Sequence, residues 1–212
     1  MILYHGTSER HLHAIQRHGL LPRRLTGQSN WSGNVASKEE FVYLTDAYPV
    51  YFAVGPALAA DDAPADLLIL KVDVDEKRLY PDEDFIAWVV TDGAQGVRQE
   101  EMNPFIDPRA YQAAWHLSLQ HNGVVCTPKV PPKRILDHRV IPRSEAELIA
   151  ELGLEPMPTP LNYRFMGSHY RRCIEALFEQ GSEAALQIVR QRWEMIGESG
   201  ASEPLPTGKG TE

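Results

Sequence analysis

The chain has 212 residues, 43% hydrophobic and 24% charged, which is the composition of a globular protein long enough to bury a sizeable core. The formal net charge of -8 argues against indiscriminate adhesion to nucleic acid or membranes, although a local basic patch stays possible. It has two cysteines, no N-terminal signal pattern and no stretch near the ~18 apolar residues of a spanning helix, so we expect a reduced, soluble, cytoplasmic protein without a membrane partner.

The first half of the chain alternates apolar strands with polar loops. The elements expected in chain order are a strand over 2–4, a helix over 8–18, a polar loop over 23–40, a strand over 41–45, an interrupted helix over 46–60 and a strand over 67–74. The loop over 23–40 is long for a connector, and long loops are often functional. The strand over 67–74 begins with four apolar residues, so we expect it to be central in a sheet.

The second half mixes helices and strands without regular alternation. We expect an acidic loop over 75–84, a strand over 85–91, a loop over 92–106, a helix from Asp107 that ends at Gly123, and strands over 124–127 and 135–141. A capping box at 144–147 predicts a short helix, and two more helices follow over 169–178 and 183–195. This order favours an α+β fold over a doubly wound parallel sheet. The expected units are a domain over 1–143, a helical extension over 144–196 and a disordered tail over 197–212.

The most informative residues are His5, Gly6 and Thr7, which follow the first apolar strand. A strand holds the imidazole rigidly, a glycine lets a ligand approach the backbone, and a hydroxyl can bind the ligand or cap the next helix. Tyr43 lies in the next strand, and Tyr51 lies in the helix after it. This order predicts the floor of a polar pocket, although His5 and Tyr43 taken singly are also compatible with packing roles.

This ordered set resembles the ADP-ribosyltransferase superfamily, which cleaves NAD at the nicotinamide bond. The resemblance spans roughly residues 2–141 and implies a split β-sandwich with flanking helices, here carrying a C-terminal helical appendage. It implies that His5 binds the adenosine-side ribose of NAD and that the backbone of Gly6 binds the nicotinamide amide. Tyr43 is then expected beside the nicotinamide. Tyr51 is the expected stacking aromatic, with Tyr48 or Phe52 as alternatives, and Thr7 and Ser29 complete the expected NAD contacts.

The superfamily places an acidic residue at the start of a late strand, and this sequence departs from that pattern. The matching stretch, 118–127, has no Asp or Glu. His121 or Asn122 can bind a ribose hydroxyl there, although a neutral group stabilises a developing cation less well than a carboxylate does. Glu101, with Glu100, is the nearest acidic substitute, although it lies about twenty residues upstream, where a solvated loop charge is the more usual interpretation.

A basic run over 129–143 contains Lys129, Lys133, Arg134 and Arg139. In the implied fold it lies beside the pocket, where it could bind the NAD pyrophosphate or a nucleic-acid acceptor, but such a run is usually a solvated face. His11 and His13 are about 200° apart on a helix, so we expect no metal site. Cys126 follows two valines and is expected to be a buried structural thiol.

Three functions therefore compete. The first is an NAD-consuming enzyme that transfers ADP-ribose to a protein or nucleic-acid acceptor. The second is an RNA 2′-phosphotransferase-like enzyme, a branch that the stretches 122–125 and 130–132 resemble, although its N-terminal domain and one expected arginine near residues 54–57 are missing. The third is an inactive protein that binds or senses an NAD-like ligand, which the missing acid favours.

Overall fold

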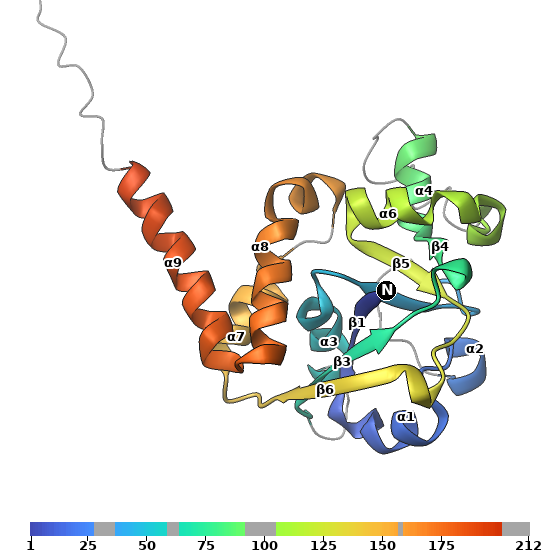
Figure 1. Cartoon of the computed structure of the whole chain (residues 1–212), viewed down its shortest axis with the longest axis horizontal. Helices are drawn as coiled ribbons and strands as arrows, with labels where there is room; N and C mark the ends of the chain where they lie inside the picture. The colour runs from blue at the N-terminus through green and yellow to red at the C-terminus, as the bar shows by residue number, and fades with distance from the viewer. Residues whose placement is uncertain (28–36, 59–63, 92–104, 157–158, 201–212) are drawn as a thin grey trace, which may run out of the picture.

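One antiparallel sheet organises the chain (Figure 1). The computed structural model describes residues 1–27, 37–58, 64–91, 105–156 and 159–200, with side chains described to residue 192. Its strands are β1 (Ile2–Ser8), β2 (Val42–Thr45), β3 (Leu67–Asp73), β4 (Tyr80–Pro81), β5 (Val124–Thr127) and β6 (Ile135–Ile141), in the order β4-β5-β2-β1-β3-β6. The predicted α+β class is confirmed.

Strand β3 is central, as its sequence predicts. It pairs with β1 on one side and with β6 on the other, and its first four residues are buried. Alternate residues enter two core clusters: Leu67 and Ile69 face one, and Leu68 and Leu70 face the other. A strand covered on both faces needs apolar residues at successive positions, which explains the unbroken run.

The junction between β1 and β2 divides the sheet into two halves. Seven residue pairs join β1 to β3, from Ile2 opposite Asp73 to Ser8 opposite Leu67. Only one pair, Tyr4 opposite Thr45, joins β1 to β2. A split into two sheets was expected, whereas the described strands form one sheet whose halves meet at this single pair.

Helices cover the sheet and its ends. They are η1 (Glu9–His11), α1 (Leu12–His18), α2 (Arg23–Thr26), α3 (Pro49–Leu58), η2 (Glu76–Arg78), α4 (Glu83–Val90), η4 (Pro108–Ala114), α6 (Trp115–Asn122) and η5 (Pro132–Arg134). In Figure 1, α4 and α6 lie together at the β4–β5 end, and α1 lies near β6 at the other end. The first turn of α3 lies so close to β1 that a Cβ on Gly6 would sit 1.7 Å from the carbonyl oxygen of Pro49.

The C-terminal helices share a core with the sheet. They are α7 (Ala146–Ile149), η6 (Ala150–Leu154), α8 (Pro160–Glu179) and α9 (Ser182–Gly200), and α9 extends away from the body in Figure 1. One buried cluster joins Tyr4 and Leu67 of the sheet to Tyr170, Ile174 and Leu177 of α8. The extension is thus packed on the sheet through a continuous apolar interface.

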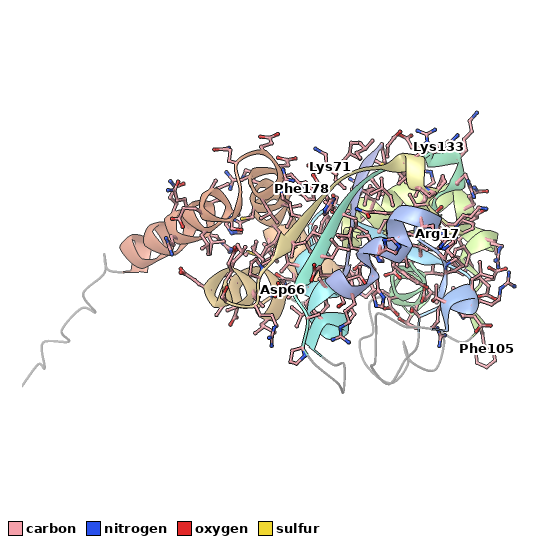
Figure 2. All side chains as sticks on the ribbon, turned by 90° about the horizontal axis from the view of Figure 1, so that it is seen from below. Arg17, Asp66, Lys71, Phe105, Lys133 and Phe178 are labelled. Carbon is pink, nitrogen blue, oxygen red and sulfur yellow. The ribbon has the colours of Figure 1, made fainter. Side chains whose placement is uncertain are left out.

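Polar contacts reinforce the docking of α8 at both of its ends. Near its start, Tyr163 donates a 2.7 Å hydrogen bond to Asp46, and Arg171 binds the same carboxylate at 3.0 Å. Near its end, Phe178 lies beside Lys71 of β3 (Figure 2), with the Lys71 ammonium 5.8 Å from the ring centroid. Such cation–π contacts add modestly to apolar packing.

Several predicted boundaries were wrong. Residues 85–91 were predicted as a strand, but α4 covers 85–90, because Glu83 and Asp84 favour a helix N-terminus and three apolar residues face inward. Strand β1 continues to Ser8, whose side chain caps no helix.

In the C-terminal region, the capping box at 144–147 does not form: Glu145, not Ser144, is the N-cap of α7 and makes no side-chain cap. Helix α8 begins at Pro160, not 169, because Thr159 caps it and proline suits the first turn. The predicted tail from 197 is wrong as far as Gly200, where α9 ends, and 201–212 lie outside the described residues.

Candidate functional site

His5 lies where β1 and β2 diverge. Its Nδ1 is 2.9 Å from the backbone carbonyl oxygen of Tyr43. A carbonyl oxygen only accepts, so Nδ1 carries the proton and donates it, which makes Nε2 the accepting nitrogen of the neutral ring. Burial lowers the pKa of His5. The imidazole is therefore a fixed, uncharged acceptor at neutral pH.

Tyr43 links this histidine to a carboxylate that sequence analysis missed. The Tyr43 hydroxyl lies 2.6 Å from both carboxyl oxygens of Glu83, the first residue of α4. The backbone N–H of Lys38 donates to the same hydroxyl at 2.9 Å and to Glu83 Oε1 at 3.2 Å. Glu83 is only 2% exposed, so its oxygens depend on these protein donors.

The electrostatics assign distinct roles to the phenol and the carboxyl. Burial, and then the charge of Glu83, raise the pKa of Tyr43 well above its ordinary value, so the phenol stays protonated and donates. Burial raises the pKa of Glu83, while the bond from Tyr43 opposes that shift. A carboxylate in this setting can bind a hydroxyl, stabilise a nearby cation or accept a proton.

A second carboxyl, Asp82, lies directly before Glu83 and is 5% exposed. Asn122 of α6 donates a 2.8 Å hydrogen bond to Asp82 Oδ2. The Asp82 backbone N–H donates to the Ser118 hydroxyl at 3.0 Å, and that hydroxyl donates to the carbonyl of Val124 at 2.7 Å. Helix α6 therefore fixes the N-terminus of α4 against β5.

Cys126 completes the buried surroundings of the carboxyl pair. It lies opposite Tyr43 in the β2–β5 ladder, and its thiol is 3.5 Å from the carbonyl of Pro81. Burial, and then Glu83 and Asp82, raise the pKa of this thiol well above its ordinary value. Cys126 is a buried thiol, as the sequence predicted, and its raised pKa disfavours the reactive thiolate.

The predicted pocket residues come together only in part. His5 reaches the backbone of Tyr43, not its ring, and the Tyr43 ring continues the chain of contacts to Glu83. Gly6 faces α3, which fills the space expected for a ligand, and Thr7 is buried in β1. Tyr51 is half-buried on α3 with its ring edge-on to Phe52, at 5.3 Å between centroids.

The two residues expected to replace the motif acid lie in different surroundings. His121 is exposed and stacks on Phe85 at 6.3 Å. Asn122 is buried, but its amide is directed to Asp82. The buried carboxyl that contacts the Tyr43 hydroxyl comes from α4, not from the stretch before β5. Glu101 and Ser29 lie outside the described residues.

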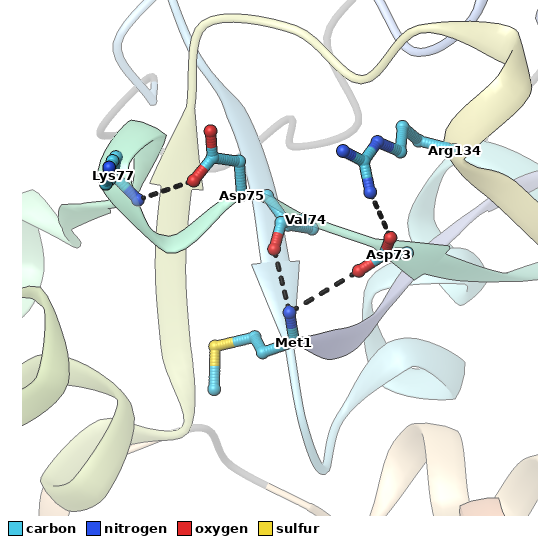
Figure 3. A network of polar contacts seen from close by, with 6 residues as sticks. All are labelled: Met1, Asp73, Val74, Asp75, Lys77 and Arg134. Carbon is cyan, nitrogen blue, oxygen red and sulfur yellow. Dashed lines mark hydrogen bonds and ion pairs between the residues drawn. The ribbon is translucent and has the colours of Figure 1, made fainter.

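The basic run begins at Lys129, two residues after β5, and continues through η5 into β6 at the edge of the sheet. Arg139 on β6 therefore lies two strands from His5 and three strands from Tyr43. Arg134 pairs with Asp73, which also binds the amino group of Met1 (Figure 3). Arg139 donates a 2.6 Å bond to the carbonyl of Phe178 at the end of α8. Lys129 and Lys133 are exposed.

No cluster of three or more His, Cys, Asp or Glu side chains in the described part of the chain is arranged to hold a metal ion. Within the same residues, no helix has the length and apolar character needed to cross a bilayer. Neither the models of known protein families nor the curated proteins contain a match to this sequence.

Proposed function

We propose that this protein is an NAD-consuming enzyme of the ADP-ribosyltransferase type, which transfers ADP-ribose to a protein or nucleic-acid acceptor and releases nicotinamide. One observation carries the proposal: a chain of contacts runs from His5 through Tyr43 to Glu83. The sequence provides the histidine and the tyrosine of the resembled motif but no acid at the expected position. Glu83 supplies a carboxylate beside that tyrosine from another element.

The chemistry requires groups of these kinds. The bond between ribose C1′ and the nicotinamide nitrogen breaks, and nicotinamide leaves with the bonding electrons as a neutral molecule. The ribose becomes cation-like, and the acceptor then forms a bond to C1′ and loses its proton. In this proposal His5 Nε2 accepts from a ribose hydroxyl, Tyr43 lies beside the nicotinamide, and Glu83 stabilises the cation and takes the proton of the acceptor.

For Glu83 to act in this way, its present contacts must be exchangeable. The Tyr43 hydroxyl lies 2.6 Å from both carboxyl oxygens but has one proton to donate, so a ribose hydroxyl can take one oxygen while the phenol keeps the other. Glu83 is 2% exposed, so binding must be accompanied by local rearrangement around it. If this rearrangement does not occur, the protein would bind NAD without turning it over, as the sensor alternative states, and the test below distinguishes that outcome.

The phosphotransferase alternative has less support. The Asn122 side chain, from the stretch that favoured it, is directed to Asp82. Arg139 holds the end of α8 and so is not an obvious phosphate ligand.

The experiment uses NAD labelled in its adenylate phosphate, with and without a cell extract, and follows nicotinamide release and label transfer. We expect Glu83→Gln to lower release by about 10²-fold or more, the range for losing one transition-state stabiliser. Glu76→Gln is the matched control, because Glu76 is exposed on η2. NAD binding without release would instead support the sensor. If NAD neither binds nor reacts, the proposal is wrong, and 2′-phosphorylated RNA becomes the substrate to test.

A further inference from the structure

Two buried carboxyls follow one another in the chain at Asp82 and Glu83. Their exposed fractions are 5% and 2%, so water screens neither of them. Two adjacent negative charges in such surroundings repel strongly, and each also loses its hydration. Carboxyl pairs that share a site in this way usually retain one proton between them.

The hydrogen-bond donors show which member of the pair keeps its charge. Glu83 accepts the one proton of the Tyr43 hydroxyl, which lies 2.6 Å from both of its oxygens, and its Oε1 also accepts from the Lys38 backbone N–H. Each of these donors stabilises the ionised form of Glu83. The neutral amide of Asn122 donates to Asp82, which no positively charged side chain contacts among the described hydrogen bonds and ion pairs.

We propose that Asp82 holds a proton and shares it with Glu83, so that the pair carries one negative charge, and that Asn122 keeps Asp82 in place for this. Asp82 is thus a positioning residue for the carboxylate of Glu83. The catalytic consequence rests on the proposed function, whereas the shared proton itself does not.

The surroundings agree with this distribution. Burial, and then the charges of Asp84 and Glu83, raise the pKa of Asp82 well above its ordinary value. A backbone hydrogen bond from Asp84 opposes this shift, and a hydrogen bond with Glu83 adds to it. The titratable and charged groups around the pair and its neighbour Cys126 are Tyr43, Cys126, Lys38, Asp84, Asp107 and Arg109. The raised pKa values of Tyr43 and Cys126 keep both groups neutral, so neither competes for the role of anion.

In the proposed reaction, the carboxyl pair begins with only one shared proton, so Glu83 can still receive a second one. As the acceptor bonds to C1′, its O–H or N–H bond breaks and the proton passes to Glu83. The pair then holds two protons and no charge, and it returns one proton to water after the product leaves. A single charge stabilises the cation-like ribose with less self-repulsion than two charges would produce.

Infrared spectroscopy of the whole chain at neutral pH, without NAD, tests the shared proton. We expect the carbonyl stretch of a protonated carboxyl in the native protein and in the control Glu76→Gln, which changes an exposed carboxyl on η2. The band should vanish in Asp82→Asn and move to higher frequency in Asn122→Ala, since a hydrogen bond to Asp82 is lost. An absent band in the native protein, or one that survives Asp82→Asn and vanishes in Glu83→Gln, would overturn the inference.

A second measurement covers the case in which a variant folds poorly. When folding raises the pKa of a carboxyl, the protein loses folding stability as pH rises from the unfolded pKa of that group to its folded pKa. The folding constant of the native protein relative to Asp82→Asn should therefore fall by up to about tenfold per pH unit above about pH 4. A constant ratio contradicts the shared proton. Because neither measurement uses NAD, failure of the proposed enzyme activity would leave both results interpretable.

Discussion

The contact between Tyr43 and Glu83 can be measured as a coupling free energy. Tyr43→Phe removes only the hydroxyl that binds both oxygens of a carboxyl 2% exposed. A hydrogen bond to a charged group contributes about 1.5–3 kcal/mol, against about 0.5–1.5 kcal/mol for a neutral one. We therefore expect Tyr43→Phe to lower the free energy of unfolding by about 1.5–3 kcal/mol, and by about 1 kcal/mol less when Glu83 is already Gln.

The assay is urea unfolding of the native protein, both single variants and the double variant at pH 7. For a chain of this length, the expected loss corresponds to a fall in Tm of about 3–12 °C in a parallel thermal scan. Effects of the two substitutions that add to within about 0.5 kcal/mol would mean that the two side chains are energetically independent. That result would refute the assignment of Glu83 as a charged acceptor of the phenol.

Three further predictions concern the scaffold. Gly6→Ala should lower the free energy of unfolding in urea by about 3 kcal/mol or more, because the new Cβ would lie 1.7 Å from a carbonyl oxygen of α3. The control Gly27→Ala has no heavy atom within 4 Å but a φ of 72°, so it should cost about 1–2 kcal/mol. Equal costs for the two variants would contradict the close approach of α3. Burial lowers the pKa of His169 to about 4, so stability should be lost as pH falls from about 6.5 to 4, by up to about 1.4 kcal/mol per unit, and His169→Gln should remove this part of the pH dependence. Arg139→Ala should cost about 1–2 kcal/mol, because it loses the bond to the Phe178 carbonyl and the cation–π contact at 5.3 Å; an unchanged urea midpoint would show that this anchor of α8 is dispensable.

Three strands were predictable from their apolar residues, two inside the sheet and β6 at its edge. Residues 67–73, 124–127 and 135–141 form strands as expected. Helix α4 was missed because a short apolar run has no decisive periodicity, and only the acidic residues before it favour a helix. Had Asp82 and Glu83 been taken as an N-terminal helix signal, they would have been placed at a helix start but still not beside Tyr43.

The candidate site shows the same limit. His5 and Tyr43 were identified from their place on consecutive strands, and the antiparallel pairing of these two strands brings them together across 38 positions of the sequence. Glu83 is 40 residues from Tyr43, and its position depends on the pairing of β4 with β5 and on the clamp that Ser118 and Asn122 form. Such long-range pairing leaves no periodic signal in one sequence. The location of Arg139 at the opposite edge likewise follows from strand order alone.

The apolar interface between α8 and the sheet has a practical consequence for genetic screens. Tyr4 packs against Phe178 at 5.3 Å between ring centroids and directly precedes His5 in β1. Cavities opened in α8 will therefore loosen the strand that holds the imidazole. A search for loss-of-activity alleles should recover C-terminal substitutions that never meet a substrate, and raising the growth temperature should make their defects worse.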